Sequence, residues 1–378
     1  MELSEEHQLI QETAQRFAAE RLAPNAEQWD REAHFPRDAL AEMGELGLMG
    51  ILVPEEDGGA GADFTSYALA LAEIAGGDGG VSTTMAVQTL TGTCLSAFAN
   101  DEQKRRFLPD LASGRSLGAF MLTEPHTGSD AGALKCTAKK DGNQYVLSGT
   151  KQFITTGANA DVAVVFAVTD PDAGSRGISA FILPTDTPGY QVARVEHKLG
   201  QKTSDTAQIM LDDVKLPPDL LLGEEGEGYK IALSNLEGGR VGIAAQSVGF
   251  AAAAYRAART YAKERTTFGK AIIDHQAIGF KLAEMATQLE AGRLMMLNAA
   301  RLKSEGRPCL KEASMAKLFC SEMAERVCSE AIQIHGGYGY LSDFPVERIY
   351  RDARVCQIYE GTSEVQKLVI SRSIREEG

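Results

Sequence analysis

The order in which helical and strand-like patterns follow one another constrains the fold of this chain more than any other feature. From Ser4 to about residue 118, apolar side chains recur at the spacing of helices with one buried face. Short segments rich in Val, Ile and Phe follow, and long Ala- and Leu-rich helical segments then return. The pattern predicts an α+β multidomain fold: an N-terminal helical domain at 1–118, a central β-domain at 119–226 and a C-terminal helical bundle at 227–378.

The length and the charge of the chain narrow the class of protein. A chain of 378 residues is long enough for two or three domains and for a deeply buried site. Its 52 acidic and 38 basic residues give a net charge of -14, and no Lys/Arg-rich block offsets it. Nucleic acid and anionic membranes are therefore poor candidate partners.

The sequence also argues against a membrane span and a signal peptide. The most apolar run, 241–254, is shorter than a membrane span, and the first residues, "MELSEEHQ", contain no apolar core. We therefore expect a cytoplasmic protein if the source is bacterial, and a mitochondrial matrix-like compartment otherwise.

The cysteines are scattered, without a C-x-x-C pair or an alternating Cys/His cluster. Zinc sites and disulfide frameworks both require such spacing, so we expect neither of them and no metal site. We expect these thiols to be free and buried: Cys94, Cys136, Cys309, Cys320, Cys328 and Cys356.

Two hydroxyl-rich segments end strands of the predicted β-domain, "LTEPHTGSD" at 122–130 and "GTKQFITTG" at 149–157. Hydroxyls and backbone N–H groups beside glycine can donate to a polar ring or a phosphate, because no Cβ blocks the approach. Segments of this composition are more often simple turns, so both interpretations stay open on the residues alone.

The C-terminal region offers two further candidate segments. "KERTTFGK" contains Arg265, a permanently charged group with five donors, beside Phe268, and Gln276 follows. An arginine on a helix is more often solvated or ion-paired than functional. The G-G-x-G of "QIHGGYGY" at 333–340 permits close backbone approach, but it lacks the preceding strand of a dinucleotide fingerprint.

The segment "IYEGTSEVQ" puts a lone carboxylate, Glu360, beside a glycine. Ser363 and Gln366 have capping-box spacing, so a last helix is predicted to begin just after Gly361, with Glu360 in a non-helical link. The helix N-terminus would favour the ionised carboxylate, whereas an apolar cavity with Ile358 and Tyr359 beside it would raise its pKa. The alternative is a surface glutamate in a capping loop.

Six ordered motifs that cover essentially the whole chain resemble those of the acyl-CoA dehydrogenases. The motifs are "MLTEPHTGSD", "GTKQFITTG", "KERTTFG", "QIHGGYG", "YRDAR" and "IYEGTSEVQ". The resemblance implies a C-terminal four-helix bundle, FAD lying between the β-domain and the bundle, a homotetramer, and α,β-dehydrogenation of acyl-CoA thioesters.

The resemblance also implies particular contacts. Phe153 and Ile154 would pack behind the flavin with Thr155 near N5, and the segments around Arg265 and Gln333 would reach FAD across a subunit interface. Phe153 stands where many relatives have Trp, and His126 and His335 receive no catalytic role. The implied FAD-binding residues are Leu122, Thr123, Ser129, Phe153, Ile154, Thr155, Arg265, Phe268, Gln276, Gln333, Ile334, His335, Gly336, Gly337, Thr362, Ser363 and Glu364.

Glu360 occupies the position of the catalytic base in this family. The base takes the weakly acidic α-hydrogen of the thioester, while a ribityl hydroxyl of FAD and the backbone N–H of the base residue bind the carbonyl oxygen. The β-hydrogen leaves as hydride to flavin N5. Some branches of the family draw the base from the "LEGGR" helix, where this chain has Gly239. The implied substrate-binding residues are Ser129, Glu237, Gly238, Gly239, Arg240 and Gly361.

Within the family, the C-terminal runs look most similar to the short-chain, butyryl-CoA-like enzymes and to the 2-methyl-branched ones. The resemblance further implies an electron-transferring flavoprotein as the acceptor. Two alternatives remain: a flavin acyl-CoA oxidase or monooxygenase of the same fold that uses O₂, and a non-catalytic CoA-binding protein.

Overall fold

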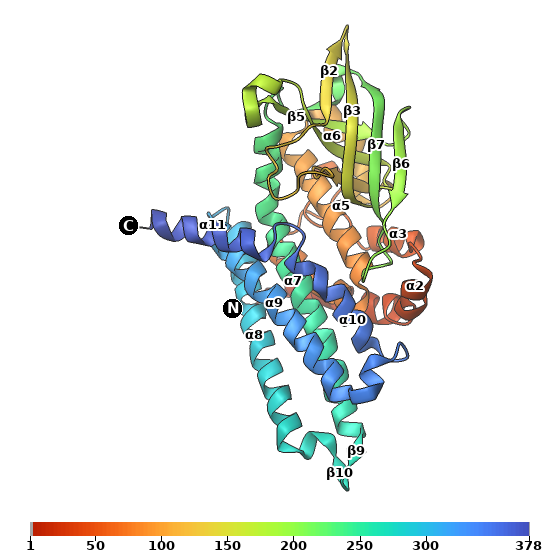
Figure 1. Ribbon diagram of the computed structural model, residues 1–378, viewed down its shortest axis with the longest axis vertical. Coiled ribbons are helices and arrows are strands. Elements are labelled where there is room, and N and C mark those ends of the chain that lie inside the picture. Colours follow the sequence, from red (N-terminus) through yellow and green to blue (C-terminus); the bar gives the residue numbers. More distant parts are fainter. Residues whose placement is uncertain (1–2, 378) are drawn as a thin grey trace.

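The computed structural model describes residues 3–377, and helices form its N-terminal region (Figure 1). A π-helical turn, η1 (Ala18–Leu22), continues the first helix, and a 3-10 turn, η2 (Glu55–Asp57), precedes the fourth. The helices are α1 (Glu5–Phe17), α2 (Ala26–Glu32), α3 (Arg37–Glu45), α4 (Phe64–Gly77), α5 (Gly79–Phe98) and α6 (Asp101–Ala112).

Polar side chains cap the starts of these helices. The Ser4 hydroxyl accepts from the backbone N–H of His7 (3.1 Å), and the His7 ring accepts from the N–H of Ser4 (3.2 Å). Asp63 and Asp78 accept in the same way from the third residues of α4 and α5. Each cap satisfies a backbone donor that the helix leaves without a partner.

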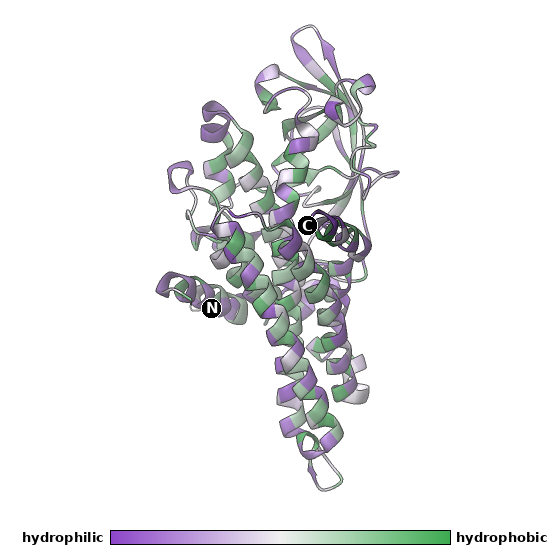
Figure 2. Ribbon diagram, turned by 90° about the vertical axis from the view of Figure 1, so that its left-hand side faces the viewer, coloured by the Kyte–Doolittle hydropathy of each residue, from purple (hydrophilic) through white to green (hydrophobic). Residues whose placement is uncertain are grey.

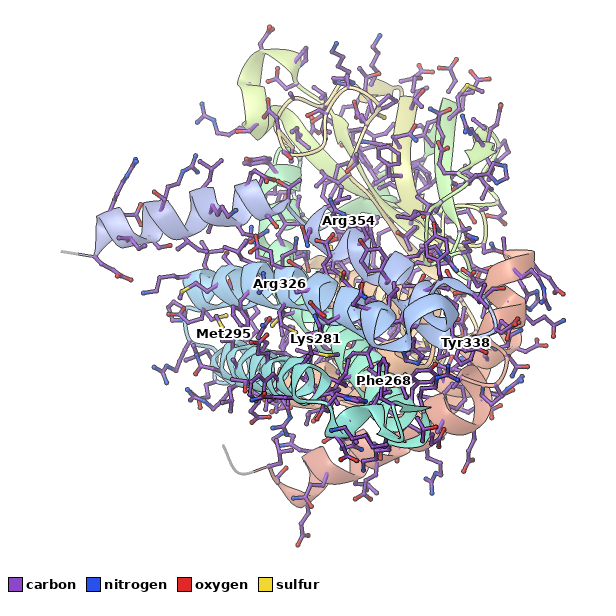
Figure 3. The ribbon with its side chains drawn as sticks, turned by 60° about the horizontal axis from the view of Figure 1, so that its bottom comes forward. Phe268, Lys281, Met295, Arg326, Tyr338 and Arg354 are labelled. Atoms are coloured by element: carbon purple, nitrogen blue, oxygen red, sulfur yellow. The ribbon has the colours of Figure 1, made fainter. Side chains whose placement is uncertain are left out.

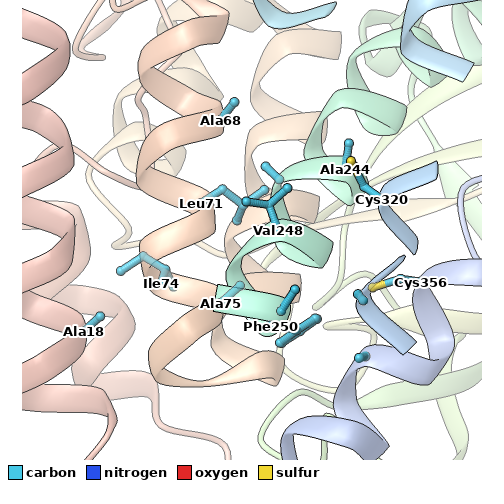
Figure 4. Close-up of a cluster of buried hydrophobic side chains, with 14 of the residues drawn as sticks. Ala18, Ala68, Leu71, Ile74, Ala75, Ala244, Val248, Phe250, Cys320 and Cys356 are labelled. Carbon is cyan, nitrogen blue, oxygen red and sulfur yellow. The ribbon is translucent and has the colours of Figure 1, made fainter. Parts of the chain in front are cut away.

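Helix α4 joins the N-terminal region to the C-terminal bundle, because it packs on α1 with one side and on α7 with another. Figure 4 shows Leu71 and Ile74 of α4 between Ala18 on one side and Val248 of α7 on the other. A helix with apolar residues on nearly every side, such as α4, is stable only when other parts of the protein cover it. The two helical regions therefore share one hydrophobic core.

The central region is a mixed sheet in the order β6-β7-β3-β2-β4-β5-β8, with β1 added in parallel to β4. The middle strands β4 and β5 bury nearly every residue, which accounts for their continuous apolar sequence. The strands are β1 (Gly118–Met121), β2 (Thr137–Asp141), β3 (Gln144–Thr155), β4 (Val162–Val168), β5 (Ile178–Pro184), β6 (Tyr190–Val195), β7 (Thr206–Leu216) and β8 (Leu221–Leu222).

An irregularity in β3 brings one aromatic side chain to the surface. Between Lys151 and Ile154, two residues of β3 stand opposite a single residue of β7. Phe153, one of the two, has a φ of 57° and a side chain that is 64% exposed. Bulges re-aim side chains in this way, so the sheet presents Phe153 outward at the end of β3.

Long helices form the C-terminal region, and Figure 2 shows apolar and polar residues alternating around them. A short hairpin of β9 (Thr266–Thr267) and β10 (Lys270–Ala271) joins two of these helices at the end of the molecule opposite the sheet (Figure 1). The helices are α7 (Gly228–Glu264), α8 (Gln276–Ser304), α9 (Leu310–His335), α10 (Pro345–Ala353) and α11 (Ser363–Glu376).

Helix α7 connects the two ends of the molecule. It begins against β5, where a Cβ on Gly228 would lie 2.6 Å from the carbonyl carbon of Ser179, and it ends at the β9–β10 hairpin. Its 37 residues, at the usual helical rise of about 1.5 Å, span about 55 Å. The sheet and the hairpin are therefore held far apart within one chain.

The predicted succession of helices, strands and helices is confirmed, and so is the prediction that the cysteines are free and buried. Within residues 3–377, no helix combines the length and the apolarity needed to cross a membrane. The cellular compartment stays a prediction.

Because α4 packs closely on α7, we predict that adding one methyl group at their contact destabilises the protein. A Cβ on Gly249 would lie 2.2 Å from the carbonyl oxygen of Ala72, so Gly249→Ala should force the helices apart and lower the free energy of unfolding by about 1–3 kcal/mol. Gly279→Ala in α8 is the matched control, because its Cβ meets nothing nearer than 3.5 Å. Chemical unfolding followed by circular dichroism compares the two; equal stabilities would contradict the packing.

Candidate active site

Glu360 lies in a short non-helical segment between the 3-10 turn η7 (Arg354–Gln357) and α11, as the sequence predicts. Its φ is 53°, in the left-handed region that few residues other than glycine adopt, and Gly361 follows with a φ of 86°. Backbone strain of this kind persists only where the surroundings hold it, and it is concentrated at functional sites.

The predicted cap of the last helix is wrong in its details. Thr362 caps α11, and its hydroxyl accepts from the backbone N–H of Val365 (3.3 Å). Ser363 is already the first helical residue, so its hydroxyl cannot take the cap position. Gln366 does not close a capping box; its amide instead donates to the carbonyls of Glu360 (3.2 Å) and Gly361 (2.9 Å).

The carboxylate of Glu360 faces helix α7. A Cβ on Gly239 would lie 2.6 Å from Glu360 Oε2, and this oxygen is buried without a hydrogen-bond partner among residues 3–377. Burial raises the pKa of Glu360, and the positive charges of Lys317 and Arg240 oppose the rise. Burial, with a smaller contribution from the charge of Glu360, also raises the pKa of Tyr67.

Hydrogen bonds hold the Glu360 segment on both sides. Before it, the Tyr359 hydroxyl donates to the side chain of Gln246 (2.9 Å) and accepts from the amide of Gln201 (3.2 Å). After it, Lys317 Nζ donates to the carbonyl of Gly361 (2.7 Å). Ile358 is 53% exposed, so it contributes less to an apolar cavity than the sequence suggested.

The two hydroxyl-rich segments of the β-domain meet each other. The backbone N–H of Gln152 donates to the carbonyl of Thr123 (2.9 Å), and the fully buried Lys151 donates to the carbonyl of Leu122 (3.2 Å) and to the carboxylate of Glu124 (2.8 Å). This buried ion pair fixes the loop after β1 against β3. Ile154 is buried, Thr155 is half-buried and Ser129 is exposed.

The loop at 201–205 lies beside both the end of β3 and the Glu360 segment. The backbone N–H of Thr156 donates to the carbonyl of Asp205 (3.2 Å), and Gln201 contacts Tyr359 as described above. The exposed Phe153 and the strained Glu360 segment therefore flank one loop. Phe153, at the end of β3, and the segment 360–364 form a first group of predicted residues around this loop.

A second group gathers at the far end of the bundle. Arg265, Phe268, Ile334, His335, Gly336 and Gly337 line a cavity of about 550 Å³. Its walls are aromatic: the rings of Tyr261 and His335 stack 4.4 Å apart, and the guanidinium of Arg265 lies 5.8 Å from the ring centroid of Tyr338. Figure 3 shows Phe268 and Tyr338 at this end, and Phe268 is 97% exposed. Gln276 and Gln333 are exposed nearby, at the start of α8 and on the last turn of α9.

The two groups lie apart along the bundle. On α7, Gly239, which lies beside Glu360, is 26 residues before Arg265, which is about 39 Å at the usual helical rise. On α9, Lys317, which bonds to Gly361, is 16 residues before Gln333, which is about 24 Å.

Four of the six predicted substrate-binding residues, Glu237 to Arg240, lie within α7; Ser129 lies in the loop after β1 and Gly361 just before α11. Glu237 accepts from Cys309 Sγ (2.6 Å) and pairs with Lys303 (3.6 Å), and a Cβ on Gly238 would lie 3.1 Å from the ring of Phe64. Gly239 and Arg240 face Glu360 instead.

Lys317 was not among the residues predicted from the sequence. It shares a helical face with Ala313, Cys320 and Ala324, which are all buried. A lysine at helical spacing among apolar residues was the signal that could have identified it.

Family models and relatives match this chain over nearly its whole length. The N-terminal, middle and C-terminal domain models of acyl-CoA dehydrogenases match residues 4–115, 119–214 and 226–375. An acyl-CoA dehydrogenase of Bacillus subtilis is 49% identical, with 98% of each chain covered. The mitochondrial short-chain specific acyl-CoA dehydrogenase of Bos taurus is 47% identical over 98% of this chain and 90% of that protein.

A solved structure extends the likeness to the fold. Butyryl-CoA dehydrogenase from Megasphaera elsdenii superposes with a TM-score of 0.97 at 42% identity, over 99% of both chains. The chain belongs to the acyl-CoA dehydrogenase family, whose members are FAD-dependent oxidoreductases.

The residues between the sheet and the bundle fit a flavin. Phe153 offers an exposed aromatic face, while Thr156 Oγ1 and Ser363 Oγ are buried without a partner among residues 3–377. Buried hydroxyls without partners are rare, and a ring system with N–H and C=O groups at its edge would supply them.

The contact of Gly239 with Glu360 gives a prediction. In Gly239→Ala, the new Cβ would overlap Glu360 Oε2, so the flexible carboxylate must rotate away. Because a misplacement of 1 Å can cost about 100-fold in rate, we expect flavin reduction by substrate to slow by about that factor. Stopped-flow absorbance measures the rate, and FAD content and circular dichroism check the fold. An unchanged rate would contradict the importance of this contact.

Proposed function

We propose that this protein catalyses the α,β-dehydrogenation of short-chain acyl-CoA thioesters, with Glu360 as the base that takes the α-proton. The observation that carries the proposal is the carboxylate oxygen of Glu360, which is buried and has no hydrogen-bond partner among residues 3–377. A carboxylate kept from water and left without donors is a stronger base than a solvated one.

The surrounding residues suit this role. Arg240 and Lys317 favour the ionised form of Glu360 by their charge, and no hydrogen bond within residues 3–377 occupies Oε2. The backbone N–H of Glu360 also donates to no residue within 3–377, so it is free to bind the carbonyl oxygen of the thioester. Gly239 leaves the space that the α-carbon needs beside the carboxylate, and its lack of a side chain argues against a base on α7.

FAD, when bound, supplies the acceptor for the β-hydride. The residues proposed to hold its flavin are Leu122, Thr123, Ser129, Phe153, Ile154, Thr155, Thr362, Ser363 and Glu364. By the resemblance, Arg265, Phe268, Gln276 and the segment 333–337 are proposed to hold the FAD of another subunit. About 39 Å of α7 lies between Arg265 and Gly239, the residue beside Glu360. This separation fits an assembly of several copies, for which we propose a homotetramer.

The substrate class and the acceptor are part of the same proposal. Short acyl groups are supported by the names of the relatives, two of which are a short-chain specific enzyme and a butyryl-CoA dehydrogenase. The acceptance of 2-methyl-branched acyl groups, the contacts of Glu237 and Gly238 with the substrate, and electron transfer to an electron-transferring flavoprotein rest on the resemblance alone.

Anaerobic titration of the purified protein tests the reaction. We expect butyryl-CoA to bleach the flavin absorbance. The extent of bleaching by 2-methylbutyryl-CoA then shows whether branched acyl groups are also accepted. Admitting air should then restore the absorbance only slowly, whereas fast reoxidation would favour the oxidase alternative. A bound flavin that no acyl-CoA bleaches would contradict the proposal, and a protein without flavin would favour a CoA-binding role.

Glu360→Gln tests the base directly. Glutamine has nearly the same shape but cannot accept the proton, so we expect FAD to remain bound and flavin reduction to slow by about 10²–10⁴-fold or more. Retained fast reduction would exclude Glu360 as the base.

The pH dependence of flavin reduction gives a further prediction. Only the ionised carboxylate can act as the base, so the single-turnover rate should rise with pH through the pKa of Glu360. Because burial raises this pKa, the midpoint should lie above the ordinary glutamate value of about 4.3. A rate that falls as the pH rises over the same range would contradict this role.

A further inference from the structure

We propose that Lys317 is a positioning residue for the catalytic base: its ammonium group holds the Gly361 carbonyl, keeps the adjacent Glu360 carboxylate in place and, by its charge, favours the ionised form of that carboxylate. The inference rests on the proposed function of Glu360 and adds a second residue, from a different helix, to the site. Lys317 contacts neither substrate nor the reacting atoms in this scheme; it acts through Glu360.

The burial of Lys317 is the first argument. Lys317 lies on α9 with none of its surface exposed, and Ala313, Cys320 and Ala324 on the same helical face are equally buried. Lysine is almost never fully buried without a compensating partner, because removing its charge from water is costly. Burial lowers the pKa of Lys317 to about 8, which agrees with this cost.

The partner of Lys317 is the second argument. Its hydrogen bond goes to the Gly361 carbonyl (2.7 Å), next to the strained Glu360 backbone. The other fully buried lysine of this chain, Lys151, is neutralised by the carboxylate of Glu124 at 2.8 Å. Within residues 3–377, Lys317 forms no such ion pair, although its charge acts on Glu360. A purely structural lysine would be expected to resemble Lys151.

Charged and titratable groups from three helices face Glu360: Arg240 on α7, Lys317 on α9 and Tyr67 on α4. Lys317 itself is faced by Cys356 and Glu364, in addition to Arg240 and Glu360. Arg240 remains when Lys317 is replaced, so the loss of Lys317 should weaken the ionisation of Glu360 and not abolish it.

The first test measures the ionisation of Glu360 without any turnover. In Lys317→Met, which keeps the length of the side chain, the pH midpoint of the protonated-carboxyl infrared band should move up by about one unit. The band is assigned by its absence from Glu360→Gln. Lys281→Met is the matched control, because Lys281 on α8 pairs with Glu330 on α9, outside the site, and its replacement should leave the midpoint unchanged.

The second test measures the proton step alone. A 3-thia-acyl-CoA has α-hydrogens but no β-hydrogen, so in D₂O the base breaks the α-C–H bond, takes the proton and returns a deuteron, with no oxidation. Mass spectrometry follows the exchange. In Lys317→Met, the exchange rate should begin to fall at a higher pH than in the wild type, by the same shift as the infrared midpoint. At pH values below the midpoint, exchange should therefore be about tenfold slower than in the wild type. Binding of the analogue should be retained.

The outcomes separate the two proposals. If both profiles keep their wild-type midpoints in Lys317→Met while thermal stability falls, Lys317 acts by packing and the inference is overturned. If Lys317→Met does not fold, Lys317→Gln is judged by the same midpoints. If the wild-type protein exchanges no α-hydrogen, the proposed function fails, and the infrared titration still decides the role of Lys317.

Discussion

The burial of one carboxylate oxygen, Oε2 of Glu360, is the constraint on which the rest of the site depends. Keeping this oxygen from water disfavours the charged form of Glu360, and nearby positive charge partly offsets that penalty. Arg240 on α7 and Lys317 on α9 supply this charge, so both helices must be docked before the site exists. The left-handed backbone at Glu360 adds strain that bonds at Tyr359 and Gly361 must hold.

A buried network of hydrogen bonds connects the Glu360 segment to the central sheet region and to the N-terminal helices. In the loop after β6, Gln201 contacts Tyr359 with its amide and Asp352 with its backbone N–H, and Thr203 donates to Asp78 (2.5 Å) at the start of α5. Burial, with a smaller contribution from the charge of Asp78, raises the pKa of Asp352 to about 7. Buried networks with satisfied partners select a single arrangement, so the sheet, α5 and the Glu360 segment are held in one register.

Helix α7 has two roles that follow from its length. Near the sheet, Gly239 lets the Glu360 carboxylate approach, and at the other end the helix carries Arg265 toward an aromatic cavity. These two positions are 26 residues apart, which is about 39 Å of rigid helix. The cofactor-binding residues proposed for this chain therefore lie in two separate places on the molecule.

The amino-acid sequence by itself determined the order of helices and strands, the burial of the cysteines and the non-helical link that carries Glu360, because periodicity and glycine placement are local properties. It did not determine that Thr362, and not Ser363, caps α11, since both residue types can cap and only the backbone angles distinguish them. Only the tertiary structure decided the surroundings of the carboxylate. The closeness of Gly239, Lys317 and Glu360 arises from the docking of two helices onto one loop, and local sequence patterns carry no information about such distances.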